Sequence, residues 1–228
     1  MPWNAANKGR RITLFTLIIA GEAIFFLPFI LARVFRPTML EFFQISNTEL
    51  GLWFSIYGLV AMVSYLLGGI LADRFQARNL MAGALWLTSA GGIVMALGPP
   101  GRLMALLYGF WGFTTICLFW AAMIRATRNW GGVDFQGRAF GWLEGGRGSV
   151  AAVLGTISFF IFARDGDFRK VILVTSGITF VVGFLVRAFV PDDTSKGGRT
   201  PFRDAIKEIN SLLGRRNIWL LSLIIICA

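Results

Sequence analysis

Besides Arg187, which is near the end of its stretch, three charged residues lie inside long apolar stretches of the sequence: Glu22, Glu144 and Arg147. A carboxylate can bind and release a proton, and a guanidinium can bind an oxyanion through paired hydrogen bonds. Such groups are costly to place in apolar surroundings, so each is a candidate functional residue. The sequence holds no histidine, which removes a His general base and a His-ligated metal. These residues indicate proton and anion chemistry, and we expect neither a metal nor a cofactor.

Glu22 is a candidate proton carrier or substrate contact. It comes ten residues after Ile12, where an apolar run begins, which is roughly 15 Å along a helix and near the middle of a bilayer. Loss of water at that depth disfavours the charged carboxylate, as suits a group that takes up and releases a proton. A neutral glutamic acid that hydrogen-bonds to a neighbouring helix is the structural alternative. The sequence leaves both open.

Glu144 and Arg147 are three residues apart, so they share one face of a helix and can pair. They could bind an anionic substrate, lock their helix to another, or form a self-contained ion pair. Arg33, at the outer end of the first apolar run, either reaches lipid headgroups or lines a vestibule that attracts anions. Small residues on the helix of Glu144 form a smooth face that another helix could approach: Gly141, Gly145, Gly148, Ala152 and Gly155.

Five tryptophans have predicted places. Three fall near the ends of apolar runs and are expected to anchor at the membrane interface: Trp53, Trp130 and Trp219. Trp111 and Trp120 lie deeper, where an indole ring could stack on a sugar or pack in the core.

The elements that must position these residues are membrane-spanning helices. Charged residues make up 15% of the chain and apolar residues 56%, whereas soluble domains carry about 25% charged residues. Six apolar runs are long enough to cross a bilayer, which needs ~20 residues: 12–32, 50–72, 80–97, 103–124, 139–163 and 171–190. The fold class is therefore an all-α membrane protein, with residues 1–190 as a six-helix bundle.

The remainder of the chain is predicted to be a linker and the start of another helix. Residues 191–217 are polar and basic, with an apolar stripe typical of an amphipathic helix on the membrane surface. Residues 218–228 begin a seventh apolar run of only eleven residues. Because open backbone groups inside a bilayer are costly, we expect the chain to be truncated within a seventh helix.

The basic residues set the predicted orientation. Fourteen lie in alternate loops that share the side of the N-terminus: Lys8, Arg10, Arg11, Arg74, Arg78, Arg125, Arg128, Arg138, Lys196, Arg199, Arg203, Lys207, Arg215 and Arg216. Six lie on the other side: Arg33, Arg36, Arg102, Arg164, Arg169 and Lys170. This excess predicts a cytoplasmic N-terminus in a multi-pass protein of the cell membrane. It explains the net charge of +10 without a nucleic-acid partner.

The loop between the second and third runs, residues 69–78, reads Gly-Ile-Leu-Ala-Asp-Arg-Phe-Gln-Ala-Arg. It resembles the signature loop between helices 2 and 3 of the major facilitator superfamily of secondary transporters. Gly69, Asp73, Arg74 and Arg78 match that pattern. The sequence departs from it twice, with Gln76 in place of a glycine and Ala77 in place of a cation.

The resemblance continues at the inner ends of two other helices. Asp192 follows the sixth run in a turn similar to one whose acidic residue joins the signature loop in a cytoplasmic charge network. Arg125 stands where the superfamily usually places the partner of the loop aspartate. The segment 136–148, with Glu144 and Arg147, is similar to the helix-5 entry of the branch related to organophosphate–phosphate antiporters. The resemblance assigns these loop residues to gating.

The resemblance implies a twelve-helix bundle, of which this chain is the N-terminal half and the start of helix 7. It implies secondary active transport of a small organic solute by alternating access, coupled to a proton or a second solute. The solute could be anionic, a sugar or a sugar phosphate, and the other half of the polypeptide would complete the site. A proton-coupled drug or metabolite efflux pump is the alternative within the same fold. A channel or a membrane-embedded enzyme is less well supported, since no filter segment or catalytic cluster is evident.

The orientation can be checked by cysteine accessibility labelling in intact cells, with Cys117 and Cys227 replaced. We expect cysteines at 8, 78, 128 and 207 to react only after the membrane is permeabilised, and cysteines at 41, 101 and 166 to react from outside. Reaction of a cysteine at 78 with an external, membrane-impermeant reagent would contradict the orientation.

Overall fold

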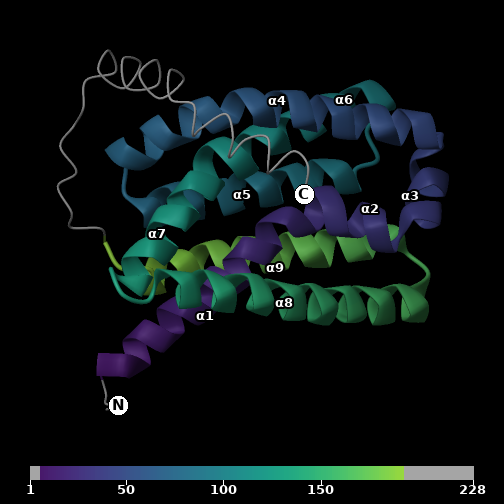
Figure 1. The fold of residues 1–228 in the computed structure, drawn as a ribbon. Helices are drawn as coiled ribbons and strands as arrows, with labels where there is room; N and C mark the ends of the chain where they lie inside the picture. Colours follow the sequence, from purple (N-terminus) through teal and green to yellow (C-terminus); the bar gives the residue numbers. More distant parts are fainter. Residues whose placement is uncertain (1–5, 193–228) are drawn as a thin grey trace. The chain divides into compact units, whose positions relative to one another are not determined.

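The structure, a computed structural model, describes residues 6–192 of the 228-residue chain. All secondary structure in this part is helical (Figure 1). In chain order the elements are α1 (Ala6–Phe25), η1 (Phe26–Ile30), α2 (Leu31–Val34), α3 (Arg36–Phe43), α4 (Asn47–Arg74), α5 (Ala77–Ala96), α6 (Gly101–Gly112), η2 (Phe113–Trp120), α7 (Ala121–Gly131), α8 (Gln136–Asp165) and α9 (Phe168–Phe189).

Six helical segments among the described residues are long and apolar enough to cross a membrane: Gly9–Val34, Asn47–Arg74, Ala77–Ala96, Gly101–Gly131, Gln136–Asp165 and Phe168–Phe189. The predicted all-helical fold with six spans is confirmed. Two helices begin before their apolar runs at a polar cap. Ser46 accepts from the backbone of Glu49 and starts α4 before the run at residue 50. Asp167 accepts from the backbone of Arg169 and starts α9 before the run at residue 171. The predicted linker and seventh helix lie outside the described residues.

Two π-helical segments and the short helix α3 have no counterpart in the hydropathy pattern. Pro28 has no backbone N–H, and in η1 the N–H of Leu31 bonds to the carbonyl of Phe26, five residues back. In η2 the hydroxyl of Thr115 donates to the carbonyl of Trp111 at 2.6 Å and competes with the backbone ladder. Both segments widen their helices in the middle of the bundle.

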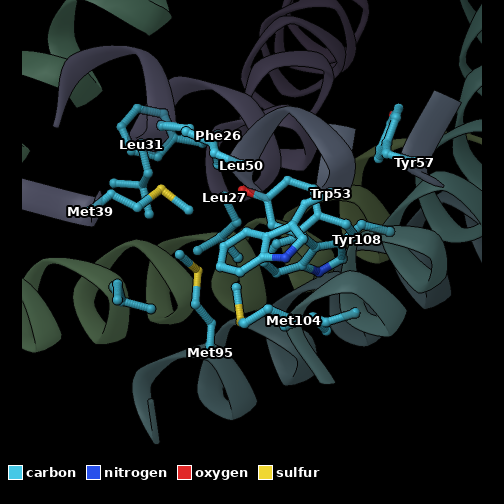
Figure 2. Close-up of a cluster of buried hydrophobic side chains, with 14 of the residues drawn as sticks. Phe26, Leu27, Leu31, Met39, Leu50, Trp53, Tyr57, Met95, Met104 and Tyr108 are labelled. Atoms are coloured by element: carbon cyan, nitrogen blue, oxygen red, sulfur yellow. The ribbon is translucent and has the colours of Figure 1, made fainter. Parts of the chain in front are cut away.

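The spans pack in a defined order. α5 lies against α9, α4 against α6 and η2, and α1 against both α8 and α9 (Figure 1). Two buried apolar clusters result. Figure 2 shows the first, which includes Phe26, Leu27, Trp53, Met95, Met104 and Tyr108. The second includes Leu17, Ile24, Met81, Phe119, Met123 and Val182.

Trp53 shows where a prediction from span position was wrong. Its ring is 2% exposed and packs against Phe43 and Tyr108 in the first cluster, so it does not serve as an interface anchor. Position near a span end is not enough to place a ring at the interface, because neighbouring aromatic rings such as Phe43, the last residue of α3, can cover it. Burial of so large a ring against aromatic neighbours contributes to packing instead.

Two glycines bring α1 and α8 close together. A Cβ added at Gly146 of α8 would lie 2.7 Å from Ile18 of α1, and a Cβ added at Gly21 of α1 would lie 3.1 Å from Arg147. The smooth face of small residues predicted on α8 is not part of this contact. A Cβ at Gly141, Gly145, Gly148 or Gly155 would meet no described atom within 4 Å. The close approach therefore depends on Gly21 and Gly146, beside the two charged residues that meet there.

The neighbouring glycines Gly146 and Gly145 form a matched pair for testing this packing. Gly146→Val should push Ile18 away and lower stability by about 1–3 kcal/mol, because overpacked contacts force neighbouring groups to move. Gly145→Val imposes the same change in helix propensity but meets open space, so it should cost less. Thermal unfolding of both variants in detergent measures the difference. Equal melting temperatures would show that α1 and α8 do not meet closely at Gly146.

Candidate functional site

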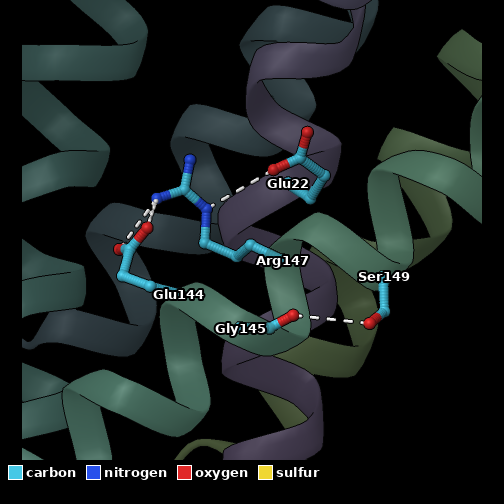
Figure 3. Close-up of polar contacts among 5 residues, drawn as sticks. All are labelled: Glu22, Glu144, Gly145, Arg147 and Ser149. Atoms are coloured by element: carbon cyan, nitrogen blue, oxygen red, sulfur yellow. Dashed lines mark hydrogen bonds and ion pairs between the residues drawn. The ribbon is translucent and has the colours of Figure 1, made fainter.

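Arg147 of α8 lies between two carboxylates from different helices (Figure 3). Its Nη1 donates to both carboxylate oxygens of Glu144, at 3.0 Å each. Its Nε lies 3.4 Å from Oε2 of Glu22 on α1, an ion pair without a well-aligned hydrogen bond. The Glu22 side chain is 8% exposed and that of Glu144 is 58% exposed. One guanidinium thus joins a buried carboxylate to an exposed one.

Aromatic rings flank the same guanidinium. Its central carbon lies 5.6 Å from the ring centroid of Phe25 and 5.6 Å from that of Trp120. A cation over an aromatic face is attracted by the ring quadrupole, more strongly where water is excluded. The rings belong to α1 and to the end of η2, so both of these elements contact Arg147 of α8.

A cavity of about 550 Å³ opens beside this cluster. Four spans contribute its walls, and none of its lining residues comes from α5 or α9. They are Glu22, Phe25, Phe29, Ile30, Arg33, Tyr57, Ala61, Tyr65, Ile116, Trp120, Arg147, Gly148 and Ala151. The volume is that of a small-molecule site, and the mix of aromatic walls with a few charged groups is typical of such sites.

The remaining residues predicted near the site have definite places. Arg33 is exposed and lines the cavity, as the vestibule interpretation requires. Trp120 is half-buried in the cavity wall, where its ring contacts Phe25 and Arg147. Trp111 is buried and donates its indole N–H to the carbonyl of Thr88 at 3.1 Å, which makes it a packing residue.

The signature loop lies away from this cavity, at one end of the bundle. The Nε of Arg78 is 2.5 Å from Oδ1 of Asp192, so the loop pairs with the turn after α9. Gly69, Asp73 and Arg74 are exposed. Asp73 forms no hydrogen bond or ion pair with a residue in 6–192, so it is not paired with Arg125 in this structure. The gating role of all these residues stays a prediction.

A second cavity, of about 520 Å³, lies at this end. Its charged lining residues are already engaged: Arg10 donates to the carbonyl of Trp130 at 2.7 Å, and Asp192 pairs with Arg78. Trp130 in turn donates to the carbonyl of Arg10 at 2.6 Å, and Thr13 to that of Phe189 at 2.9 Å. These contacts tie helix ends together, so the cavity beside Arg147 is the better candidate for solute binding.

The sequence indicated Glu22, Glu144 and Arg147 as candidates but did not predict that Glu22 contacts Arg147. Nothing in helical spacing says which face of α8 meets α1. The available signal was a pair of glycines, each directly before a charged residue: Gly21 before Glu22 and Gly146 before Arg147. Small residues mark close helix contacts in membranes, and the charges beside them then face each other.

The fold and the cavity define a multi-pass membrane protein with a charged, solute-sized space between its helices. Residues 11–228 match the model of the Major Facilitator Superfamily, and the chain belongs to that family. The superfamily predicted from the signature loop is thereby confirmed.

Three relatives show how similar the chain is to known proteins. Inner membrane protein YqcE of Escherichia coli (strain K12) is 31% identical over 83% of this chain and 46% of its own length. Inner membrane protein YihN of the same organism is 26% identical over 93% of this chain and 52% of its own. An uncharacterized protein MG294 homolog of Mycoplasma pneumoniae is 25% identical over 92% and 50%. The chain spans about half the length of these relatives.

The ion pair between Arg78 and Asp192 can be tested by exchanging its charges. Asp192→Arg alone should lower the transport rate, because it puts two cations together where α5 and α9 are tied. The double variant Arg78→Asp/Asp192→Arg should recover part of that loss. The pair itself should contribute only about 0.2–1 kcal/mol to stability, since both side chains are partly exposed.

The pair between Lys170 and Asp165, at 2.9 Å, is the matched control, since it is an exposed pair next to the turn between α8 and α9. Exchanging these charges should leave transport unchanged. If the Arg78/Asp192 double variant is no more active than Asp192→Arg, the pair has no role in transport.

Proposed function

We propose that the protein is a secondary transporter that moves a small organic anion by alternating access, with Glu22 carrying the coupling proton. The observation that carries the proposal is the charged cluster of Glu22, Arg147 and Glu144 on the wall of a solute-sized cavity. In transporters of this general kind, substrate and coupling-ion sites lie near the middle of the bilayer, between helices. Glu22 has that position in its span.

The coupling would follow from competition for Arg147. While Glu22 is ionised, it holds the guanidinium through the contact at 3.4 Å. A proton on Glu22 removes the negative charge, and Arg147 can then bind an oxyanion of the solute. Loss of the proton restores the ion pair and favours release of the solute. Proton and solute would therefore travel together, and each would bias the conformation that binds the other.

Orientation and cellular place belong to the same proposal. With the N-terminus in the cytoplasm, as the excess of basic residues predicts, the end that carries Arg78 and Asp192 faces the cytoplasm. Arg33 then lies on the outer side of the cavity. A network of ion pairs at the inner end would stabilise one conformation of the gate, and breaking it would shift the equilibrium between conformations.

An efflux pump for cationic compounds is the second candidate. It would need a carboxylate in the cavity free to bind a cation. Both acidic groups of the cluster already pair with Arg147, and Arg33 adds a further positive charge to the cavity. The charges of the described part therefore favour an anion.

Glu22→Gln is the direct test of the coupling role. In membrane vesicles that contain the full polypeptide encoded by the gene, uptake driven by a proton gradient should fall to the background of empty vesicles. Exchange of labelled for unlabelled solute across the membrane should continue, because exchange needs no net release of the proton. Addition of an uncoupler should abolish wild-type uptake in the same way.

Glu41→Gln is the matched control, since Glu41 is an exposed carboxylate on α3, away from the cavity. It should leave uptake and exchange unchanged. Loss of both activities in Glu22→Gln would mean that Glu22 contacts the solute and does not serve as proton carrier alone. Normal uptake with an unchanged pH profile would show that Glu22 is structural.

A further inference from the structure

The guanidinium of Arg147 has one edge that the described residues leave incompletely paired. Nη1 is engaged by both oxygens of Glu144. Nε is buried, and although Glu22 lies 3.4 Å away it makes no hydrogen bond. The third nitrogen, Nη2, forms no hydrogen bond with another residue in 9–192, and Figure 3 shows it without a contact among the residues drawn. Nε and Nη2 point along the same edge of the planar group.

That edge is suited to a planar oxyanion. Two parallel N–H donors of an arginine bind the two oxygens of a carboxylate in a bidentate arrangement, which gives both strength and a fixed orientation. A buried donor without an acceptor is destabilising, so an acceptor at Nε would relieve a penalty that Glu22 relieves only in part. A solute carboxylate on this edge would take over the contact with Nε.

The charges at the cavity, counted over the described residues, limit the charge of the solute. Arg147 and Arg33 on the cavity wall bring two positive charges. Glu22 on the wall and Glu144, which pairs with Arg147 but does not line the cavity, bring two negative charges. The set is neutral while Glu22 is ionised and carries one positive charge once Glu22 holds a proton. A solute with one negative charge restores neutrality. A phosphate monoester, at about −1.5 to −2, would leave uncompensated negative charge beside the largely buried side chains of Glu22 and Arg147, which is costly.

We propose that the transported solute is a small monovalent carboxylate that binds the Nε–Nη2 edge of Arg147 when Glu22 is protonated. The proposal rests on the function proposed above and narrows its substrate class. The body of the solute packs on the aromatic wall of Phe29, Tyr57 and Trp120. This separates carboxylates from the sugar phosphates that the family resemblance left open.

The proposal also implies that solute binding weakens as Glu22 loses its proton. Several charged or titratable groups face Glu22 from the elements around the cavity, and they set the field in which it titrates: Arg147 and Glu144 on α8, Arg33 on α2, and Tyr57 and Tyr65 on α4. Of these, Arg147 is in direct contact with Glu22. Solute and Glu22 compete for this one group, so the affinity for a carboxylate falls as pH rises.

The test is a set of four solutes that share one ring and differ in charge: glucose, glucuronate, glucose 6-phosphate and glucosamine. Binding to the purified full polypeptide is measured by thermal stabilisation at constant ionic strength. Glucuronate should bind at least about tenfold more tightly than glucose, since hydrogen bonds to charged groups contribute about 1.5–3 kcal/mol. Its affinity should fall between mildly acidic and mildly alkaline pH.

Two variants of Arg147 distinguish the effect of its paired N–H donors from the effect of its charge. Arg147→Lys keeps the positive charge but loses the paired donors, and it should lose most of the preference for glucuronate, as should Arg147→Gln. If Arg147→Lys kept the full preference for glucuronate over glucose, the positive charge alone would account for binding, and the bidentate assignment would be overturned. Both variants are compared only if their melting temperatures without solute lie near that of the wild type. Glu41→Gln, the exposed control on α3, is the third comparison and should keep the preference.

Tighter binding of glucose 6-phosphate or glucosamine, or no stabilisation by glucuronate, would overturn the assignment of a monovalent carboxylate. Either result would leave the coupling role of Glu22 standing, because that role depends on the uptake and exchange assays of Glu22→Gln. Failure of those assays with intact glucuronate binding would instead reject the proton-carrier role and keep the carboxylate site.

Discussion

The contact between Glu22 and Arg147 is the interaction on which the organisation of this bundle depends. A charge in the middle of a membrane protein must be compensated by a partner, and removing one member of such a pair leaves the other buried and uncompensated. The guanidinium here is compensated three times: by Glu22, by Glu144 and by the rings of Phe25 and Trp120. α1, η2 and α8 must therefore meet at one place, and the cavity lies beside that place.

The packing of the helices serves this meeting point. Gly21 and Gly146 allow α1 and α8 to approach closely, and the buried cluster around Leu17 and Met123 holds α1 against its neighbours. The two π-helical segments lie where the spans Gly9–Val34 and Gly101–Gly131 pass the cavity. They direct Phe29 and Ile30 from one side and Ile116 and Trp120 from the other into its wall. A π-turn inside a helix often marks a functional site.

Much of the fold follows from the sequence because the bilayer imposes a simple rule. A span must satisfy its own backbone hydrogen bonds and cover them with apolar side chains, so six long apolar runs become six helices. The signature loop indicates the superfamily because its charges at 73, 74 and 78 lie in a short loop between two such runs. The helix α3, by contrast, is eight residues long and amphipathic, and hydropathy carries no signal for it.

The site itself could be predicted only in part. Ionisable residues in apolar runs are conspicuous, and Glu22, Glu144 and Arg147 were identifiable for that reason. Which helix face meets which depends on side-chain packing across the bundle, and no periodicity within one helix encodes it. The predicted smooth face of α8 illustrates this: its glycines are open in the described structure, while Gly146, outside that pattern, makes the close contact with α1.

Solute-linked proton uptake tests the central account most directly. Glucuronate is added to the purified full polypeptide in weakly buffered solution, near the pH at which Glu22 is half-protonated, and the change in pH is followed with an indicator dye. If solute and Glu22 compete for Arg147, binding should draw protons from solution, up to about one per bound solute. Glu22→Gln should bind glucuronate without taking up protons. Binding without proton uptake in the wild-type protein, or equal uptake in Glu22→Gln, would contradict the account.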